Sequence, residues 1–280
     1  MNRRSFLIAA FALGVFGCAP SATEAAPFQP TRFSVQVAGS GPDVILIPGL
    51  TAGRDVWQAT ARALPGYRYH LIQVSGFAGE PTRGNARGTV VAPLADEIAR
   101  YIVDRQLERP AIVGHSMGGT VAMLIGARRP ELAGKIMVVD MLPEPAGLVG
   151  GTAANLGPLA ESLRGMLDSE GGRSLLGSLI TSFGPPDRGN RRSDPDVVGR
   201  AMHELARIDL TDDLRRIRAP LTVVYAAPDP ETRNSVDRNY AGAYQAKSGV
   251  RLVRIDNSGH MIMLDQPVRF RQALSAFLSR

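Results

Sequence analysis

Cysteine is almost absent from this sequence, since Cys18 is the only one among 280 residues. An internal disulfide, and with it a fold stapled by disulfides, is therefore excluded. Histidine is also scarce, with four residues whose spacing does not fit a zinc site. Stability must come from an apolar core, which 44% hydrophobic residues can provide in one domain of this length.

Lysine occurs only at positions 135 and 247. The formal net charge of +6 therefore comes from arginines, which are scattered along the chain and interleaved with acidic residues, as in residues 212–216. A chain that binds nucleic acid usually concentrates its positive charge in a cluster or stripe. We therefore expect no nucleic-acid partner.

The apolar run near the N-terminus is too short to span a membrane. It follows Arg3 and Arg4, extends to Phe16 and precedes a stretch of small residues. This order is typical of an export signal, and residues 3–7 resemble a twin-arginine signal. We expect residues 1–26 to be an export signal and linker that sends the protein across the bacterial inner membrane, to the periplasm or the medium.

Cys18 leaves two routes of processing open. Residues 15–18 resemble a bacterial lipobox, and cleavage there would leave a lipid-modified Cys18 at the start of the mature chain. Cleavage near Ala25 and Ala26 would instead leave a mature chain without cysteine. Neither product contains a disulfide.

In residues 27–280, apolar strand-like runs alternate with helical patterns, as expected of one domain. The expected strands are residues 32–37, 43–47, 69–74, 111–113, 135–139, 221–225 and 250–255, and the expected helices are 54–64, 90–106, 117–129, a segment within 231–247, and 267–278. This alternation predicts an α/β fold, in which a mostly parallel sheet carries helices on both faces. We expect the first strand to be antiparallel.

One insertion interrupts the alternation, between about residues 141 and 209. It has no strand-like run, but it contains helix-capable segments at 156–167, 173–180 and 195–206, and a loop rich in glycine, proline and arginine at 184–194. An insertion of this length directly after a strand predicts a helical lid above the sheet.

A serine between glycines follows the strand at 111–113. Residues 114–118 read Gly-His-Ser-Met-Gly, which fits the pattern Gly-x-Ser-x-Gly between a predicted strand and a predicted helix. Glycines let neighbouring backbone pass close to such a strained turn. The Ser116 hydroxyl would lie at the N-terminus of the helix, where free N–H groups favour developing negative charge. We interpret Ser116 as a nucleophile, against the alternative of a simple helix cap.

A serine nucleophile needs a base and an acid. His260 follows the last predicted strand and is the candidate base. Asp229 follows the strand that ends near Tyr225, and the order Ser, Asp, His is expected of this architecture. Asp140, directly after the strand 135–139, could reach the same histidine from a neighbouring strand end. Chain order favours Asp229, and Asp140 stays open as the alternative.

The other three histidines are weaker candidates for the base. His115 is adjacent to the serine, and adjacent residues in a tight turn point apart, so we expect it to pack or hydrogen-bond locally. His70 lies in an expected strand and His203 on an amphipathic segment. Both are interpreted as structural.

From about Arg32 onward the chain resembles the α/β-hydrolase fold superfamily. The resemblance rests on Ile47-Pro48-Gly49-Leu50, the segment 114–119, Asp229 and Ser258-Gly259-His260. It implies a sheet of the eight-stranded type with helices on both faces and a helical lid. The common His-Gly after the early strand is Pro48-Gly49 here, and an acidic residue often found after the following strand is replaced by Ser75-Gly76.

The resemblance also implies acyl transfer through serine. Ser116 would attack a carbonyl carbon while His260 takes its proton and Asp229 orients the imidazole. The N–H groups of Leu50 and Met117 would form the oxyanion hole. No metal or organic cofactor enters this reaction, and the expected partner is a small ester-like molecule.

The expected activity is hydrolysis of carboxylic esters of small to medium, mostly apolar substrates. The same residues would serve thioesters, amides, lactones, carbon–carbon bonds or acyl transfer, since substrate choice lies in the lid. A serine at position 116 excludes the haloalkane and epoxide hydrolases that use an aspartate there. A non-catalytic binding protein is a further alternative. Apolar residues that leave the strand ends beside the site are expected to line an acyl pocket, namely Met141, Leu142, Met261 and Ile262.

Overall fold

The computed structural model describes residues 28–155 and 192–280. In these residues seven strands form one sheet in the order β1-β3-β2-β4-β5-β6-β7. The strands are β1 (Phe33–Gly39), β2 (Asp43–Ile47), β3 (Arg68–Val74), β4 (Ala111–His115), β5 (Lys135–Val139), β6 (Leu221–Ala227) and β7 (Arg251–Asp256). Strand β1 is antiparallel to β3, and the other pairs are parallel. The predicted α/β fold and its antiparallel first strand are confirmed.

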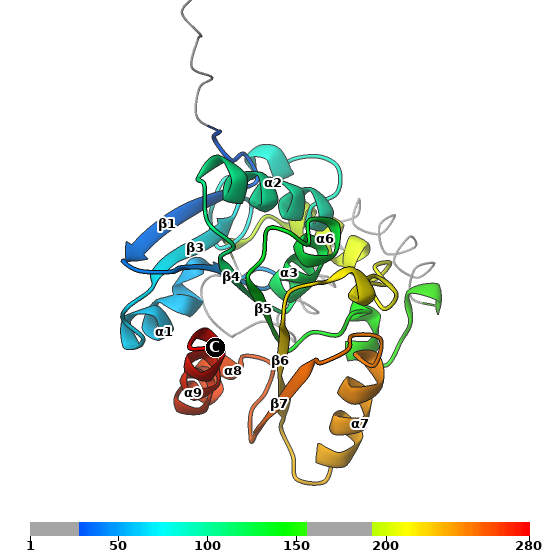
Figure 1. The fold of residues 1–280 in the computed structure, drawn as a ribbon. Coiled ribbons are helices and arrows are strands. Elements are labelled where there is room, and N and C mark those ends of the chain that lie inside the picture. The colour runs from blue at the N-terminus through cyan, green and yellow to red at the C-terminus, as the bar shows by residue number, and fades with distance from the viewer. Residues whose placement is uncertain (1–27, 156–191) are drawn as a thin grey trace, which may run out of the picture.

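Helices lie on both faces of this sheet (Figure 1). The α-helices are α1 (Gln58–Ala63), α2 (Val91–Asp104), α3 (Met117–Arg128), α6 (Pro195–Leu205), α7 (Arg233–Ala243), α8 (Ile262–Asp265) and α9 (Pro267–Leu278). Short 3-10 helices are η1 (Arg54–Trp57), η2 (Arg83–Asn85), η3 (Pro145–Val149) and η5 (Asp213–Arg216). The expected helices agree with these bounds to within a few residues, because their apolar spacing is a local property of the sequence.

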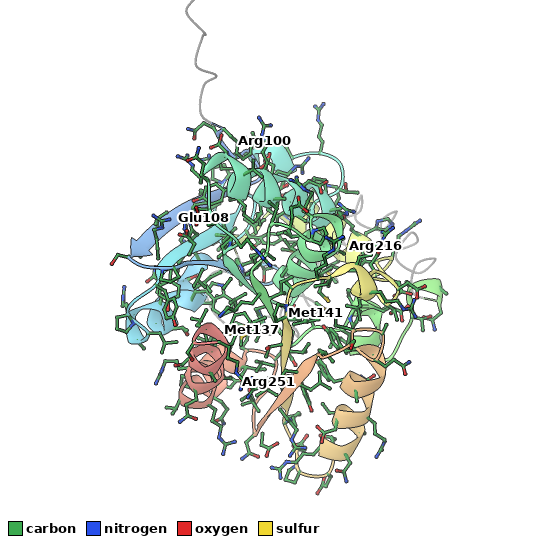
Figure 2. All side chains as sticks on the ribbon, in the orientation of Figure 1. Arg100, Glu108, Met137, Met141, Arg216 and Arg251 are labelled. Carbon is green, nitrogen blue, oxygen red and sulfur yellow. The ribbon has the colours of Figure 1, made fainter. Side chains whose placement is uncertain are left out.

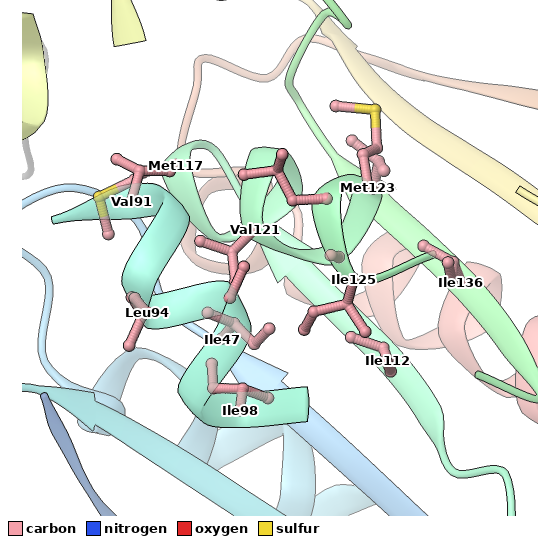
Figure 3. Close-up of a cluster of buried hydrophobic side chains, with 14 of the residues drawn as sticks. Ile47, Val91, Leu94, Ile98, Ile112, Met117, Val121, Met123, Ile125 and Ile136 are labelled. Carbon is pink, nitrogen blue, oxygen red and sulfur yellow. The ribbon is translucent and has the colours of Figure 1, made fainter. Parts of the chain in front are cut away.

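Each strand contributes side chains to two separate core layers, since successive residues of a strand point to opposite faces. On one face, Ile47 of β2 packs with residues of α2 and α3 (Figure 3). On the other face, Leu46 packs in the cluster that contains Trp57 and Phe270, whose ring centroids lie 6.0 Å apart. A sheet buried on both faces explains why its strands read as continuous apolar runs.

Charged side chains lie outside these layers. Met137 and Met141 are buried inside the molecule, whereas Arg100, Arg216 and Arg251 are exposed on separate elements (Figure 2). The labelled arginines thus do not gather on one element.

The number of strands differs from the expected one, and part of the expected lid lies outside the described residues. The resemblance implied a sheet of the eight-stranded type, whereas the described residues form seven strands, of which β1 is the first. Within the expected lid, the segment 195–206 is helical as α6, but the expected helices at 156–167 and 173–180 lie outside the described residues. So does the expected export signal at 1–26, and both the lid and the signal stay predictions.

The parallel strands bring their carboxyl ends to one edge of the sheet. Ser116 follows β4, Asp140 follows β5, and the segment that contains His260 follows β7. Ligand sites of open α/β sheets lie at this edge. The sheet order β4-β5-β6-β7 therefore brings these residues together from three different strands.

Candidate active site

Ser116 is the single residue between β4 and α3, and its backbone is strained. Its φ of 53° and ψ of −123° lie in a region that non-glycine residues rarely adopt. The turn is held by the Ser116 N–H, which donates to Val139 O at 2.9 Å, and by the Gly119 N–H, which donates to Ser116 O at 2.7 Å. The Ser116 hydroxyl does not cap α3. The alternative of a simple helix cap is therefore excluded.

The glycines beside Ser116 are required by close backbone contacts. A Cβ atom on Gly114 would lie 2.0 Å from Gly118 O, and one on Gly118 would lie 2.4 Å from Ile47 O. Neither contact is possible for a real side chain, so the turn can form only with glycine at both positions. The prediction that these glycines let backbone pass the serine is confirmed.

His260 pairs with Asp140. Its Nδ1 lies 2.8 Å from Asp140 Oδ2, and its side chain is 29% exposed while that of Asp140 is 9% exposed. The preceding residue, Gly259, donates its N–H to Asp265 Oδ2 at 2.9 Å, which ties the histidine loop to α8. A buried carboxylate on Nδ1 fixes the ring orientation and directs Nε2 as the basic nitrogen.

The Asp140 carboxylate has three hydrogen-bond partners. Oδ1 accepts from the Ala226 N–H and from the Tyr240 hydroxyl, both at 2.9 Å, and Oδ2 faces His260. The residue adopts a positive φ of 50°, and its own N–H donates to Val224 O at 2.7 Å. A buried carboxylate needs such partners, and these contacts fix the Asp140 side chain at the end of the sheet with Oδ2 toward His260.

The structure does not bring Asp229 to His260, which corrects the prediction from chain order. Asp229 is exposed, two residues beyond the end of β6. Its carbonyl oxygen accepts from the N–H and the hydroxyl of Thr232, at 3.2 and 3.0 Å, in the turn that leads into α7. The alternative, Asp140, takes the place beside the imidazole. The order Ser, Asp, His does not in fact separate the two, because Asp140 and Asp229 both lie between Ser116 and His260 in the sequence.

His115 contacts His260 without being a base. Its Nε2 lies 2.9 Å from the His260 carbonyl oxygen, and the two rings have centroids 4.6 Å apart. Burial, and then the nearby His260, lower the pKa of His115 to about 3. The ring is therefore neutral and Nε2 donates its proton to the carbonyl. We expected a local hydrogen bond, whereas the partner is the histidine loop, which His115 ties to β4.

The predicted oxyanion residues lie beside Ser116. A Cβ atom on Gly49 would lie 3.1 Å from Ser116 Cβ, so the turn that contains Leu50 passes directly against the serine. Met117 begins α3. In the described part of the chain no residue accepts a hydrogen bond from the N–H of Leu50 or Met117. Both groups are available to an oxyanion. No hydrogen bond joins the Ser116 hydroxyl to His260 in these described ranges.

Ala226 and Tyr240 are site residues that the sequence reasoning missed. Ala226 contributes only its backbone N–H, which leaves no signal in the sequence. Tyr240 is the only buried residue of α7, and Tyr244 directly follows this helix. Two tyrosines four positions apart in a mostly polar segment are the signal that could have found Tyr240.

The apolar residues expected beside the site are buried. Met141 and Leu142 are each 2% exposed, Met261 is 9% exposed and Ile262 is 0% exposed. They leave β5 and the histidine loop next to Asp140 and His260. Their role as an acyl pocket stays a prediction.

Residues 28–155 and 192–280 contain no group of three or more His, Cys, Asp or Glu side chains that could hold a metal ion. They also contain no helix long and apolar enough to cross a membrane.

Comparison with known proteins identifies the family of this chain. Residues 44–273 match the sequence model of the alpha/beta hydrolase family, which is more than three quarters of the chain. The chain belongs to the α/β-hydrolase family. This membership makes it a hydrolase, and it confirms the resemblance that the sequence carries.

Individual relatives are distant. This α/β-hydrolase is 24% identical to a pimeloyl-acyl-carrier-protein methyl ester esterase of Vibrio cholerae over 265 residues, which cover 88% of this chain and 97% of that protein. It resembles the enol-lactonase of Burkholderia xenovorans with a TM-score of 0.69 at 18% identity, over 89% of this chain and 97% of that one. A hydrolase of Pseudomonas aeruginosa gives a TM-score of 0.71 at 19% identity, over 89% and 94%. At such identities the solved structures show the fold alone.

Proposed function

We propose that this hydrolase cleaves carboxylic esters through an acyl-enzyme on Ser116. One observation carries the proposal, namely that a strained serine between a strand and a helix lies at the same sheet edge as a buried His260–Asp140 pair. A serine hydroxyl needs such a base to act as a nucleophile. A serine at this position also makes an aspartyl-ester intermediate impossible.

The reaction follows from the positions of these groups. Ser116 Oγ attacks the ester carbonyl carbon while His260 Nε2 takes its proton, and the N–H groups of Leu50 and Met117 stabilise the oxyanion. His260 then returns the proton to the alkoxy oxygen, so the alcohol leaves and the acyl group stays on Oγ. Water attacks the acyl-enzyme by the same route and releases the acid. Asp140 keeps Nδ1 protonated and stabilises the imidazolium.

The proposed substrates are esters with small to medium, mostly apolar acyl groups. Support comes from the buried apolar residues at the strand ends, among them Met141 and Met261. The names of the relatives also support an ester bond, since one is a methyl ester esterase and another an enol-lactonase. A lactone is a cyclic ester, so hydrolysis of lactones is the second candidate and uses the same steps.

Hydrolysis of a chain-length series of nitrophenyl esters and lactones tests the proposal. The wild type should hydrolyse at least one ester, and Ser116→Ala should lower kcat by about 10⁴-fold or more. A fluorophosphonate probe should label the wild type and not Ser116→Ala, because only an activated serine reacts. An inert wild type without labelling would point to a binding protein instead.

We further propose that the enzyme acts outside the cytoplasm. The support is the twin-arginine-like start and the short apolar run within residues 1–26. Fractionation of cells that express the full chain should find the activity in the periplasm, membrane or medium, and Arg3→Lys with Arg4→Lys should retain it in the cytoplasm. Metabolic labelling with a radioactive fatty acid, compared with Cys18→Ser, distinguishes a lipid-modified product from a cleaved one.

A further inference from the structure

Tyr240 of α7 and Tyr244, the residue directly after this helix, contact the strand end that carries Asp140. The Tyr240 hydroxyl donates to Asp140 Oδ1 at 2.9 Å, and the Tyr244 hydroxyl donates to the carbonyl oxygen of Met141 at 2.7 Å. Both side chains are buried, with 3% and 0% exposed. The Tyr244 N–H donates to Tyr240 O at 3.1 Å, which continues the helical pattern by one residue. Residues four apart in such a pattern lie on the same face, so the two hydroxyls reach the consecutive residues Asp140 and Met141.

The two oxygens of the Asp140 carboxylate have different partners. Oδ1 is held by the Ala226 N–H and the Tyr240 O–H, whereas Oδ2 faces His260. The Ala226 N–H belongs to β6 and approaches from the sheet, while Tyr240 approaches from the helix. A carboxylate with one oxygen held from two sides has little freedom to rotate, so Oδ2 stays directed at Nδ1.

The Tyr240 hydroxyl stays protonated, and its ring is held in place by stacking. Burial, and then the Asp140 carboxylate, raise the pKa of Tyr240 well above its usual value, so the hydroxyl keeps its proton. Its ring stacks on Tyr225, with centroids 4.3 Å apart and an angle of 16° between the planes. The Tyr225 hydroxyl donates to Asp237 Oδ1 at 2.8 Å, away from the site.

We propose that Tyr240 is a positioning residue, which holds the Asp140 carboxylate so that its second oxygen orients His260. The inference rests on the proposed function of Ser116, His260 and Asp140, and it adds the element that makes an acid at the end of β5 effective. The Tyr240 hydroxyl contacts Asp140, and Asp140 in turn contacts His260. It acts through Asp140.

Tyr240→Phe removes the O–H and keeps the stacked ring. We expect kcat to fall by about tenfold, as for loss of a hydrogen bond to a charged group. The lower limb of the kcat/KM profile should move to higher pH by about half a unit to one unit, because a carboxylate with fewer donors is more basic and stabilises the imidazolium more. Tyr225→Phe, which removes an O–H from the same stack, should change neither quantity.

Few titratable side chains face Asp140, so a shift of the kcat/KM profile in Tyr240→Phe has few possible sources. They are His260 from the loop after β7, His115 from β4, Tyr240 from α7, and Tyr244 directly after α7. His115 is neutral and both tyrosines keep their protons in the range of the measurement.

Nuclear magnetic resonance of ¹⁵N-histidine-labelled protein measures the same shift without turnover. The chain has four histidines, and the His260 pKa should rise in Tyr240→Phe and stay constant in Tyr225→Phe. An unchanged His260 pKa, or a loss of kcat that is uniform with pH, would overturn the inference even in an active enzyme. An inert wild type would overturn the proposed function instead, and the titration would still test Tyr240.

Incorporation of 3-fluorotyrosine covers the case in which Tyr240→Phe does not fold. The substitution keeps every hydroxyl and makes it a stronger donor. Among the chain's six tyrosines, Tyr240 is the one whose hydroxyl donates to Asp140. The His260 pKa should then fall, opposite to the change in Tyr240→Phe, and a constant value would contradict the role of Tyr240.

Discussion

Asp140 and His260 stand 120 positions apart in the sequence, and their side chains meet at 2.8 Å between Oδ2 and Nδ1. Strands β5 and β7, which precede them, both pair with β6. The contact therefore passes over the end of β6, where Ala226 donates its N–H to the same carboxylate. Position in the sheet, and not order in the chain, decides which carboxylate reaches the imidazole.

Asp140→Asn should abolish most of the activity, whereas Asp229→Asn should leave kcat within about twofold. An amide at position 140 cannot hold Nδ1–H as a carboxylate does, and in serine-histidine-aspartate enzymes this change costs on the order of 10⁴-fold in kcat. Asp229 is exposed and is the matched control. The measurement is kcat on the best nitrophenyl ester, with melting temperatures to confirm that both variants fold. A greater loss in Asp229→Asn would restore the prediction from chain order.

Met141→Gln should raise KM for long acyl chains more than for acetyl esters. Met141 is 2% exposed and directly follows Asp140, so a polar side chain of similar length would disfavour an apolar acyl group next to it. Met137→Gln is the control, because Met137 is equally buried but packs on the other face of the sheet. The measurement is KM along the chain-length series. The same profile in both variants would show that Met141 does not line the acyl pocket.

Stability should fall as the pH falls below about 6.5, partly because His115 stays neutral in the fold. Its pKa is lowered from 6.5 to about 3, so between these values the unfolded chain binds a proton that the native state does not bind. The contribution of His115 to the free energy of unfolding is fully present above pH 6.5. It is lost as the pH falls toward 3, at up to about 1.4 kcal/mol per pH unit. His70, whose pKa is also lowered by burial, adds an effect of the same sign.

Urea unfolding of the wild type and His115→Gln between pH 7 and pH 4 measures how much His115 contributes to the pH dependence of the free energy of unfolding. The variant should show a smaller fall in the free energy of unfolding over this range, whatever its stability at pH 7. The contribution of His70 is present in both proteins and cancels in the comparison. Parallel curves would mean that His115 is not a buried neutral imidazole.

Glu204→Gln should destabilise the protein by about 1–2 kcal/mol. The Glu204 carboxylate, at the end of α6, accepts the N–H groups of Val90, Val91 and Ala92 at 2.7–2.8 Å. These N–H groups begin α2, where a negative charge is favoured by the helix dipole. The measurement is the free energy of unfolding in urea. Glu108→Gln, an exposed change outside this contact, should have little effect, and equal values for both variants would count against the role of Glu204.

The elements and the nucleophile turn were determined by local sequence. The strands at 43–47 and 135–139 and the helix at 267–278 have the expected bounds, because apolar periodicity and flanking turn residues act over a few positions. The turn at Ser116 needed only its own glycines, whose missing Cβ atoms admit Gly118 O and Ile47 O. Such features are visible in the sequence because their physical causes are short in range.

The acid and its support were decided only by the tertiary structure. Asp140 and Asp229 both follow apolar strands, and the sequence offers no measure of which strand end lies nearer His260. The order of the sheet and the positive φ of Asp140 settle that distance. The role of Tyr240 depends on α7 packing against β6 and β7, which brings its hydroxyl to Asp140. Contacts between segments a hundred residues apart depend on packing, and packing is a property of the folded chain as a whole.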